Sequence, residues 1–139
     1  LLLAGLIMDG KHPWEKLYHP GRKTLQAVSE YAKENLNVAA QYGEWITAGE
    51  IESISQIKPG TGAIIREGLR KIAVYKDDQG KPHCYSAVCP HLGCIVRWNQ
   101  GEKSWDCPCH GSRFNVDGEV LNGPAIQPLS PVSSNVLKE

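Results

Sequence analysis

The chain has 139 residues, enough for one domain of ordinary size with a buried core and an additional segment. Its Lys and Arg residues equal its Asp and Glu residues in number, so the formal net charge is zero. No basic field is present to recruit nucleic acid or an anionic membrane, and we expect no nucleic-acid partner.

An apolar run opens the chain and stops at Asp9. Residues 1–8 are far fewer than the roughly 20 that a membrane-spanning helix requires. The run also lacks the basic leader and the small-residue cleavage site of a signal peptide. We therefore predict the buried end of a helix, no membrane anchor and a cytoplasmic protein. Because the chain begins inside this run, we expect the rest of the helix and its packing partner to precede Leu1.

A connector and a helix are predicted next. Residues 11–22 are rich in Pro and Gly, which interrupt helices and favour irregular structure. From Thr24, a fair N-cap, apolar residues recur every three or four positions through Leu36, with charged residues on the other side. This period predicts an amphipathic helix that runs to about Ala40.

Beyond residue 43 the pattern changes to short β-branched or alternating runs, separated by turn signals about every ten residues. The predicted strands are residues 63–65, 72–75, 85–88, 95–98 and 104–106. Because no helical period lies between them, they predict a mostly β fold, either an antiparallel β-sandwich or a small barrel. We place the domain boundary at residues 42 and 43, so that the segment 1–42 precedes a second domain of residues 43–139.

Several conspicuous side chains are predicted to have structural roles. Trp98 and Trp105 flank one predicted hairpin, and we expect them to pack in the core rather than to carry electrons. Cys84 lies beside a predicted strand, where a buried small apolar residue is expected. The histidines without a second ligand at metal-site spacing, His83 among them, are expected on the solvated surface.

Two short stretches carry Cys and His at ligand spacing. They read Cys89-x-His91 and Cys107-x-x-His110, and 15 residues separate the two stretches. Thiolate and neutral imidazole bind both iron and zinc, so ligand type leaves both metals open. A structural zinc site usually draws both ligands of one kind from a single loop, whereas each loop here carries one of each. This symmetry suits a two-iron cluster, with both thiolates on one iron and both imidazoles on the other.

These half-sites resemble the Rieske [2Fe-2S] motif, in which two histidines replace two cysteines on one iron. The resemblance implies that their four Cys and His residues bind a [2Fe-2S] cluster. It also implies an antiparallel Rieske-type β-sandwich with a cluster-binding subdomain, here preceded by a linker helix. Cys94 and Cys109 match the extra cysteines of the cytochrome bc-type pattern, which join in a disulfide. Rieske domains of ring-hydroxylating dioxygenases resemble the motif too, but typically lack this pair.

The resemblance also assigns roles around the cluster. Ser112 stands where a hydroxyl bonds a bridging sulfide, which would raise the reduction potential. Phe114 stands where quinol-oxidising relatives usually carry a Tyr that donates a hydrogen bond to a ligand sulfur. Because Phe lacks this donor, the reduction potential should be lower. Residues 123–125 resemble the proline loop that covers the cluster. The residues expected around the cluster are Leu92, Gly93, Gly111, Ser112, Phe114 and Pro124.

The flanking segments resemble the C-terminal part of bacterial FAD-dependent oxidoreductases of the amino-acid-oxidase-like class that carry a Rieske domain. The resemblance lies in residues 1–22, 37–42 and 59–66. It implies that the apolar run ends the last helix of a flavin domain and that residues 11–42 form the linker. No Gly-x-Gly-x-x-Gly occurs here, so FAD is expected only in the missing upstream domain.

We therefore expect a one-electron carrier domain that serves a flavin domain of the parent chain or another redox protein. The chain by itself is not expected to be catalytic, and it is too short for a mononuclear oxygenation site. The first alternative is a free-standing Rieske ferredoxin or a quinol-oxidising bc-type Rieske subunit. The missing anchor and the missing Tyr argue against the bc-type subunit. The second alternative is a structural zinc domain.

Overall fold

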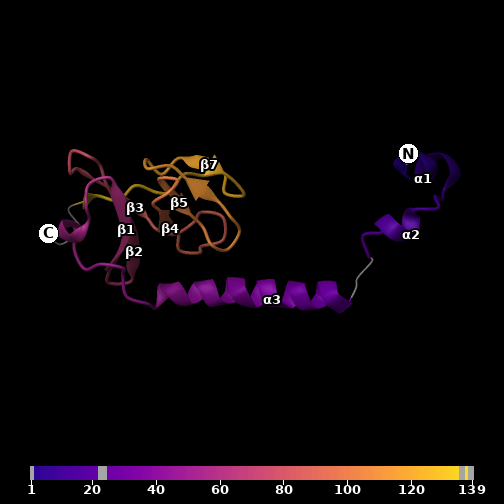
Figure 1. Ribbon diagram of the computed structural model, residues 1–139, viewed down its shortest axis with the longest axis horizontal. Coiled ribbons are helices and arrows are strands. Elements are labelled where there is room, and N and C mark those ends of the chain that lie inside the picture. Colours follow the sequence, from indigo (N-terminus) through magenta and orange to yellow (C-terminus); the bar gives the residue numbers. More distant parts are fainter. Residues whose placement is uncertain (1, 22–24, 135–136, 138–139) are drawn as a thin grey trace. The chain divides into compact units, whose positions relative to one another are not determined.

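The β-branched runs after residue 60 form two antiparallel sheets, which Figure 1 shows next to each other. The structure is a computed structural model and describes residues 2–21, 25–134 and 137. One sheet has the strand order β1-β2-β3 and the other the order β4-β5-β6-β7. The strand bounds are β1 Thr61–Glu67, β2 Arg70–Lys76, β3 Pro82–Ser86, β4 Arg97–Asn99, β5 Ser104–Asp106, β6 Arg113–Phe114 and β7 Val120–Asn122. The predicted mostly β, antiparallel fold is confirmed.

The third and fourth predicted strands are displaced in the structure. The predicted run 85–88 ends beyond β3, and the run 95–98 begins before β4. Val88 and Ile95 instead pair with each other in an isolated antiparallel bridge. This bridge joins the two ends of the loop that carries Cys89 and His91. Val88 and Ile95 therefore close that loop and do not extend the strands. Strands β6 and β7 were not predicted, because two or three residues are too few to show an alternating pattern.

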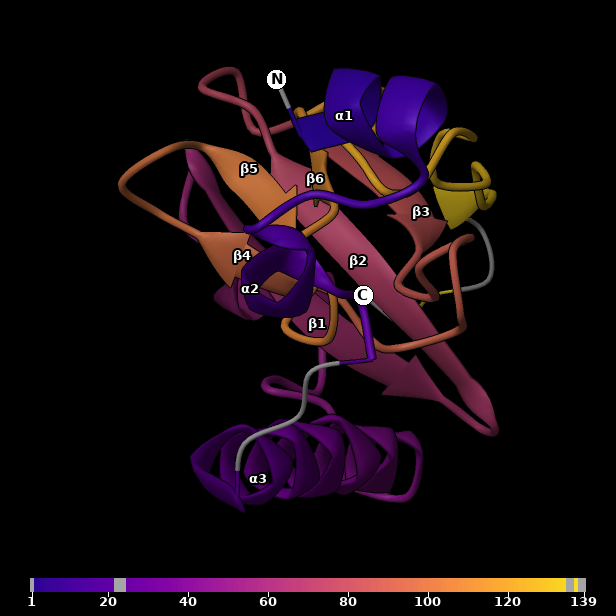
Figure 2. The ribbon, with the colours of Figure 1, turned by 90° about the vertical axis from the view of Figure 1, so that its right-hand side faces the viewer.

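The first sheet is buried on both faces because successive side chains of a strand point to opposite sides. Ile64 and Ala73 belong to a core that also contains buried residues of the second sheet and the cysteine stretches. Their neighbours Ile65 and Val74 belong to a second core. Cys84 lies in that second core, where burial raises the pKa of its thiol, as expected of a buried apolar residue. In the turned view of Figure 2, β2 crosses the middle of this sheet.

Three helical segments and two short 3₁₀ turns precede or flank the sheets. Their bounds are α1 Leu2–Asp9, α2 Glu15–Tyr18, α3 Leu25–Gln41, η1 Tyr42–Trp45 and η2 Ile54–Gln56. The amphipathic helix predicted from residue 24 is confirmed as α3, and its predicted N-cap Thr24 lies outside the described residues. The connector contains one short helix, α2, where only irregular structure was predicted. Within the described part of the chain, no helix is both long and apolar enough to cross a membrane.

The apolar run at the start of the chain is helical, as predicted, but it is not buried. Helix α1 has no buried residue, and the side chains of Ile7 and Met8 are each 80% exposed. Its residues are apolar up to Asp9, and the side chain of His12 lies against it at Gly5. By its internal contacts the chain divides into two units, Leu1–Leu36 and Asn37–Glu139, and α1 belongs to the first of them.

His83 departs from the prediction of a merely solvated surface residue. Its Nε2 lies 3.0 Å from Oδ2 of Asp77, and its side chain is only 27% exposed. The hydrogen bond to His83 lowers the pKa of the Asp77 carboxyl. His83 therefore has a structural partner at the edge of the first sheet.

The two sheets meet where Gly62 of β1 faces two tryptophans of the hairpin β4–β5. Trp98 and Trp105 pair across that hairpin with their ring centroids 5.0 Å apart. Trp105 is fully buried, which confirms the predicted packing role. A Cβ atom on Gly62 would lie 2.7 Å from a ring carbon of Trp98 and 2.8 Å from one of Trp105. Only glycine therefore lets the two rings pack against β1.

We predict that Gly62→Ala lowers the free energy of unfolding by about 1–3 kcal/mol, because the fully buried ring of Trp105 has no room to move away from the added methyl group. Chemical denaturation measures this loss. Gly101→Ala is the matched control, since its Cβ would meet only Asn99 Oδ1 at 3.5 Å. Equal stability of the two variants would contradict the packing argument.

Candidate metal centre

The first cysteine loop, residues 89–94, is closed by two backbone hydrogen bonds. The Cys89 N–H donates to the Cys94 carbonyl at 2.8 Å, and the Gly93 N–H donates to the Cys89 carbonyl at 2.9 Å. Gly93 has a φ of 77°, in the left-handed region that favours glycine. The turn leaves His91 at its tip.

The second cysteine loop, residues 107–112, repeats the same turn. The Cys107 N–H donates to the Ser112 carbonyl at 2.8 Å, and the Gly111 N–H donates to the Cys107 carbonyl at 3.0 Å. Gly111 has a φ of 75°, matching the glycine of the first loop. Each loop therefore presents its first cysteine at the base and its histidine in the turn.

The first cysteines of the two loops are buried free thiols that lie close together. Cys89 is 1% exposed and Cys107 is 3% exposed. Burial raises the pKa of the Cys107 thiol, and the adjacent Cys89 thiol raises it further. The backbone N–H groups of Cys109 and His110 act in the opposite direction, because they donate toward the Cys107 sulfur.

The two histidines also come together. The rings of His91 and His110 lie edge to face, with centroids 4.9 Å apart. Nδ1 of His91 is buried and has no hydrogen-bond partner among the described residues. A buried polar atom without a partner is costly, so this nitrogen is suited to bind something that the protein chain itself does not supply.

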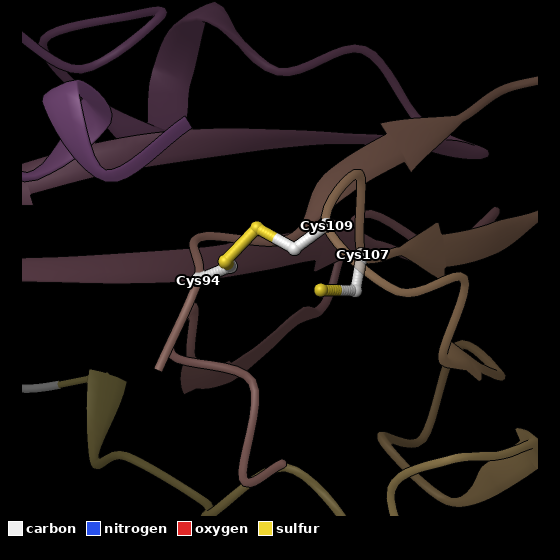
Figure 3. A group of neighbouring side chains, drawn as sticks. All are labelled: Cys94, Cys107 and Cys109. Carbon is white, nitrogen blue, oxygen red and sulfur yellow. A yellow bond between two sulfur atoms is a disulfide. The ribbon is translucent and has the colours of Figure 1, made fainter. Parts of the chain in front are cut away.

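A disulfide between Cys94 and Cys109 joins the two loops, as predicted, with the Cα atoms 6.4 Å apart. Figure 3 shows the Cys107 side chain beside this bond, and the three sulfur atoms lie within 4.8 Å of one another. Two of these three sulfurs are consumed by the disulfide. Among them, only the Cys107 sulfur can act as a thiolate ligand.

The donor set fits an iron–sulfur group. Two buried thiols and two adjacent imidazoles, one with an unpartnered buried nitrogen, are the ligand types that a mixed His and Cys cluster requires. Burial raises the pKa of the Cys107 thiol, and a bound metal ion would favour its thiolate form. The two matching loops thus bring the two predicted cysteine ligands together and the two predicted histidine ligands together.

A third segment closes the site. The Gly123–Pro124 peptide is cis, and the N–H of the next residue, Ala125, donates to Ser112 Oγ at 3.0 Å in a buried hydrogen bond. Ser112 is fully buried. Because its oxygen accepts from Ala125, its own hydroxyl proton remains available to donate elsewhere.

The other residues predicted around the cluster fall into two groups. Phe114 is fully buried in β6, where it pairs with Trp105, and it shares a core with the cysteines of both loops. Its ring offers no hydrogen-bond donor. Leu92 and Pro124 are exposed, and so lie on the outer surface of the site.

The base of the second loop is held by an ion pair that the sequence did not reveal. Asp106 precedes the loop and Arg113 follows it, and Arg113 Nε donates to Asp106 Oδ1 at 3.1 Å. Burial acts to raise the pKa of Asp106, but hydrogen bonds from Asn99, Ser104 and Arg113 outweigh it and lower the pKa. Asp106 and Arg113 are paired by the register of β5 and β6, so a correct prediction of that register would have revealed the ion pair.

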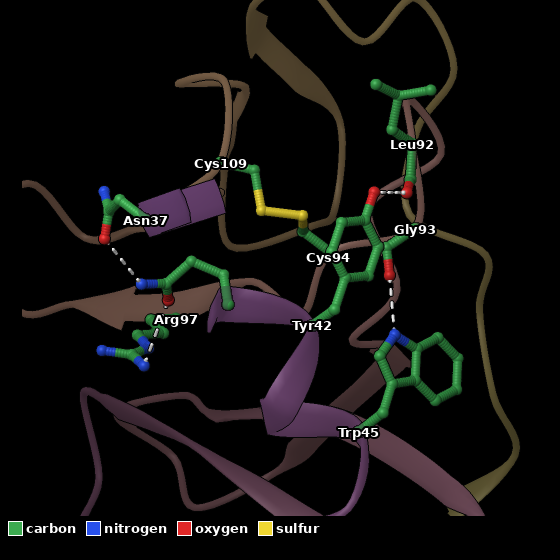
Figure 4. The surroundings of a disulfide bond; sticks show 9 residues. Asn37, Tyr42, Trp45, Leu92, Gly93, Cys94, Arg97 and Cys109 are labelled. Carbon is green, nitrogen blue, oxygen red and sulfur yellow. Dashed lines mark hydrogen bonds between the residues drawn. A yellow bond between two sulfur atoms is a disulfide. The ribbon is translucent and has the colours of Figure 1, made fainter. Parts of the chain in front are cut away.

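Two further contacts to the first loop were also missed. Tyr42 Oη donates to the Leu92 carbonyl at 2.7 Å, and Trp45 Nε1 donates to the Gly93 carbonyl at 2.9 Å (Figure 4). Both side chains come from η1, far away in the sequence. In the sequence, these two hydrogen bonds are indicated only by the presence of two aromatic residues near the predicted domain boundary.

Comparison with known proteins agrees with the site. A family model described as the Rieske [2Fe-2S] domain matches residues 44–134. The Rieske 2Fe-2S iron–sulfur protein YhfW of Bacillus subtilis is 37% identical over 139 residues, and the alignment covers 94% of this chain. The chain spans only 26% of the length of that relative.

Two relatives of different length match as well. The cytochrome b6-f complex iron–sulfur subunit of Synechococcus sp. strain WH7803 is 31% identical over 140 residues, covering 99% of this chain and 73% of the subunit. The crystal structure of the plasma membrane Rieske protein PetC3 from Synechocystis PCC 6803 superimposes with a TM-score of 0.52 and 28% identity. That match covers 67% of this chain and 100% of the other.

We predict that Ser112→Ala lowers the free energy of unfolding by about 1–3 kcal/mol, because it leaves the buried Ala125 N–H without an acceptor. Chemical denaturation measures the effect. Ser130→Ala, at an exposed position, is the control and should change stability by less than about 0.5 kcal/mol. An equal effect in both variants would show that the hydrogen bond from Ala125 to Ser112 does not contribute to stability.

Proposed function

The chain belongs to the Rieske [2Fe-2S] domain family, and on this premise we propose that it is the one-electron transfer domain of a larger flavin-dependent oxidoreductase. Electron transfer by a Rieske cluster is supported by the family match and by the relationship to a cytochrome b6-f iron–sulfur subunit. The observation that carries the proposal is the convergence of two buried thiols and two adjacent imidazoles on matching loops.

We assign Cys89 and Cys107 to one iron and His91 and His110 to the other. When bound, the cluster supplies a centre that accepts and releases a single electron. The disulfide holds the two loops at the separation that the four ligands need. Ser112 would donate its hydroxyl proton to the bound cluster, and the burial of Cys89, Cys107 and Ser112 would keep water from the sulfur ligands.

The surface around the site suits an uncharged partner. The two cysteine loops and residues 120–128 contain no Asp, Glu, Lys or Arg. Three large apolar side chains of this surface are exposed, with Leu92 55% exposed, Leu121 58% and Ile126 88%. A partner that docks here would bury apolar area rather than pair charges.

The flavin domain of the parent chain is the partner that we propose. In this arrangement residues 1–42 are the end of the flavin domain and the linker, and residues 43–139 are the Rieske domain. The exposed apolar helix α1 would pack against the upstream domain, which would also hold the FAD. The small share of YhfW that the chain spans leaves room in that relative for a further domain. We place the parent protein in the cytoplasm.

A free-standing Rieske ferredoxin or a bc-type subunit is the second candidate. The alignment over 73% of the b6-f subunit favours it. Against a quinol-oxidising role stands Phe114, whose ring cannot donate the hydrogen bond to a ligand sulfur that a Tyr provides. The family match favours iron over the structural zinc alternative.

Two measurements test the proposal. The purified chain should contain two irons and two sulfides and, once reduced, give the rhombic EPR signal of a mixed His and Cys cluster. One zinc and no sulfide would reject the electron-transfer function. In the full-length parent protein, photoreduction of the flavin should be followed by reduction of the cluster in the same molecule. A parent protein without flavin would support the second candidate instead.

We predict that Cys107→Ala abolishes cluster assembly, whereas Cys94→Ala and Cys109→Ala still assemble a cluster that is lost faster. The reason is that Cys107 supplies a ligand, while the disulfide cysteines only hold the loops together. Iron and sulfide analysis measures assembly, and Cys84→Ala controls for the loss of a cysteine outside the site. Complete failure of the Cys94→Ala variant to assemble would contradict this division of roles.

We predict that Phe114→Tyr raises the midpoint potential and that Ser112→Ala lowers it, because a hydrogen bond to sulfur stabilises the more negative reduced state. Voltammetry of the purified chain measures both shifts. Tyr18→Phe, at an exposed position, is the control for a changed phenol. No shift in either variant would reject this account of the potential.

A further inference from the structure

We infer that Tyr42 and Trp45 are positioning residues for the cluster, because they hold the first cysteine loop by its backbone carbonyls and connect it to helix α3. The inference rests on the proposed cluster ligands and goes beyond them, since neither residue carries a ligand atom. Figure 4 shows the two side chains reaching the loop that carries His91 and Cys94.

The local geometry explains why both residues reach the same loop. They occupy the first and last positions of the 3₁₀ turn η1, and side chains three positions apart in such a turn lie on the same side. Tyr42 Oη donates to the Leu92 oxygen at 2.7 Å and Trp45 Nε1 to the Gly93 oxygen at 2.9 Å. The two acceptors are successive carbonyls.

These bonds fix the orientation of the peptide units that follow His91. In a planar trans peptide the C=O and N–H groups point in opposite directions. The peptide between Leu92 and Gly93 is therefore held at both ends, with its oxygen on Tyr42 and its N–H on the Cys89 carbonyl at 2.9 Å. In the next peptide, the bond to Trp45 turns the N–H of Cys94 away from the indole.

The 3₁₀ turn is itself anchored to the sheets. Glu44 Oε1 accepts from Arg97 Nη2 at 2.7 Å, and its other oxygen lies 3.8 Å from Nζ of Lys71. Lys71 is 3% exposed and also donates to Thr47 Oγ1 at 2.7 Å and to the Ala48 carbonyl at 3.0 Å. The hydrogen bond from Thr47 lowers the pKa of Glu44, with further lowering by Arg97 and Lys71, so the carboxylate is ionised at neutral pH. The turn therefore rests on β2 and β4.

This arrangement has a consequence for the cluster. Cluster potential depends on how rigidly the surrounding backbone presents its N–H groups to the sulfurs and on how well water is excluded. The aromatic pair fixes the backbone beside the proposed ligand His91 without supplying a ligand atom itself. Removing its hydrogen bonds should lower the potential, because a looser backbone stabilises the reduced cluster less.

The test uses the whole chain with its cluster. The double variant Tyr42→Phe with Trp45→Phe removes both donors and keeps both aromatic rings. Its matched control is Tyr31→Phe with Trp14→Phe, which makes the same chemical changes at side chains that are 72% and 51% exposed. The readouts are the midpoint potential, the EPR line shape of the reduced cluster, the rate of iron release to a chelator, and amide hydrogen exchange of residues 89–97.

We expect the double variant to have a lower midpoint potential, with the ratio of reduced to oxidised cluster at a fixed applied potential falling about twofold or more. Iron release and amide exchange of the first loop should each become at least about threefold faster. The control should match the unchanged chain in all four readouts.

Two outcomes would overturn the inference. Unchanged amide exchange would show that the hydrogen bonds do not hold the loop. Faster exchange with an unchanged potential and EPR line shape would show that the loop is held but that the cluster does not respond. Absence of any Rieske EPR signal in the unchanged chain would instead reject the proposed function, and amide exchange would still decide whether the aromatic pair holds the loop.

Discussion

The disulfide between Cys94 and Cys109 is the one covalent constraint that the structure places between the two cysteine loops. Each cysteine loop is a local turn that its own backbone hydrogen bonds can close, but nothing local brings one loop to the other. The crosslink joins positions 15 residues apart and removes much of the freedom that two separate loops would have. The crosslinked loops also carry the neighbouring rings of His91 and His110, one from each loop.

Other contacts within the second unit also hold the two cysteine loops in place. The cysteines of both loops belong to the same core as Ile64, Ala73 and Trp105, so the packing of the sheets sets the depth of the loops. Gly62 permits the tryptophan pair to approach β1. The bond from Ala125 to Ser112 attaches the third segment to the second loop, and η1 attaches the linker to the first. Each loop is thus held from the sheet and from one outer segment.

The features that could be predicted from the sequence are those that depend on residues close together in the chain. Ligand spacing predicted Cys89, His91, Cys107 and His110 as ligands, and the helical period located α3 to within a few residues. The sequence could not predict the bonds from Tyr42 and Trp45, which join positions 50 and 48 residues apart. Their acceptors are backbone carbonyls that every residue has, so no side-chain pattern marks them. Strands β6 and β7 were missed because β6 depends on pairing with β5, and β7 on pairing with β6, rather than on their own composition.

The uncharged surface around the site bears on the kind of partner that the domain serves. Redox proteins that meet by diffusion gain association rate from complementary charges. This chain has a formal net charge of zero, and the segments around its site carry no charged residue, so such steering is weak. A partner on the same polypeptide does not need it, because a tether supplies a high effective concentration. The exposed apolar residues beside the site and the attachment of η1 to the first cysteine loop therefore favour the proposed electron transfer within one polypeptide.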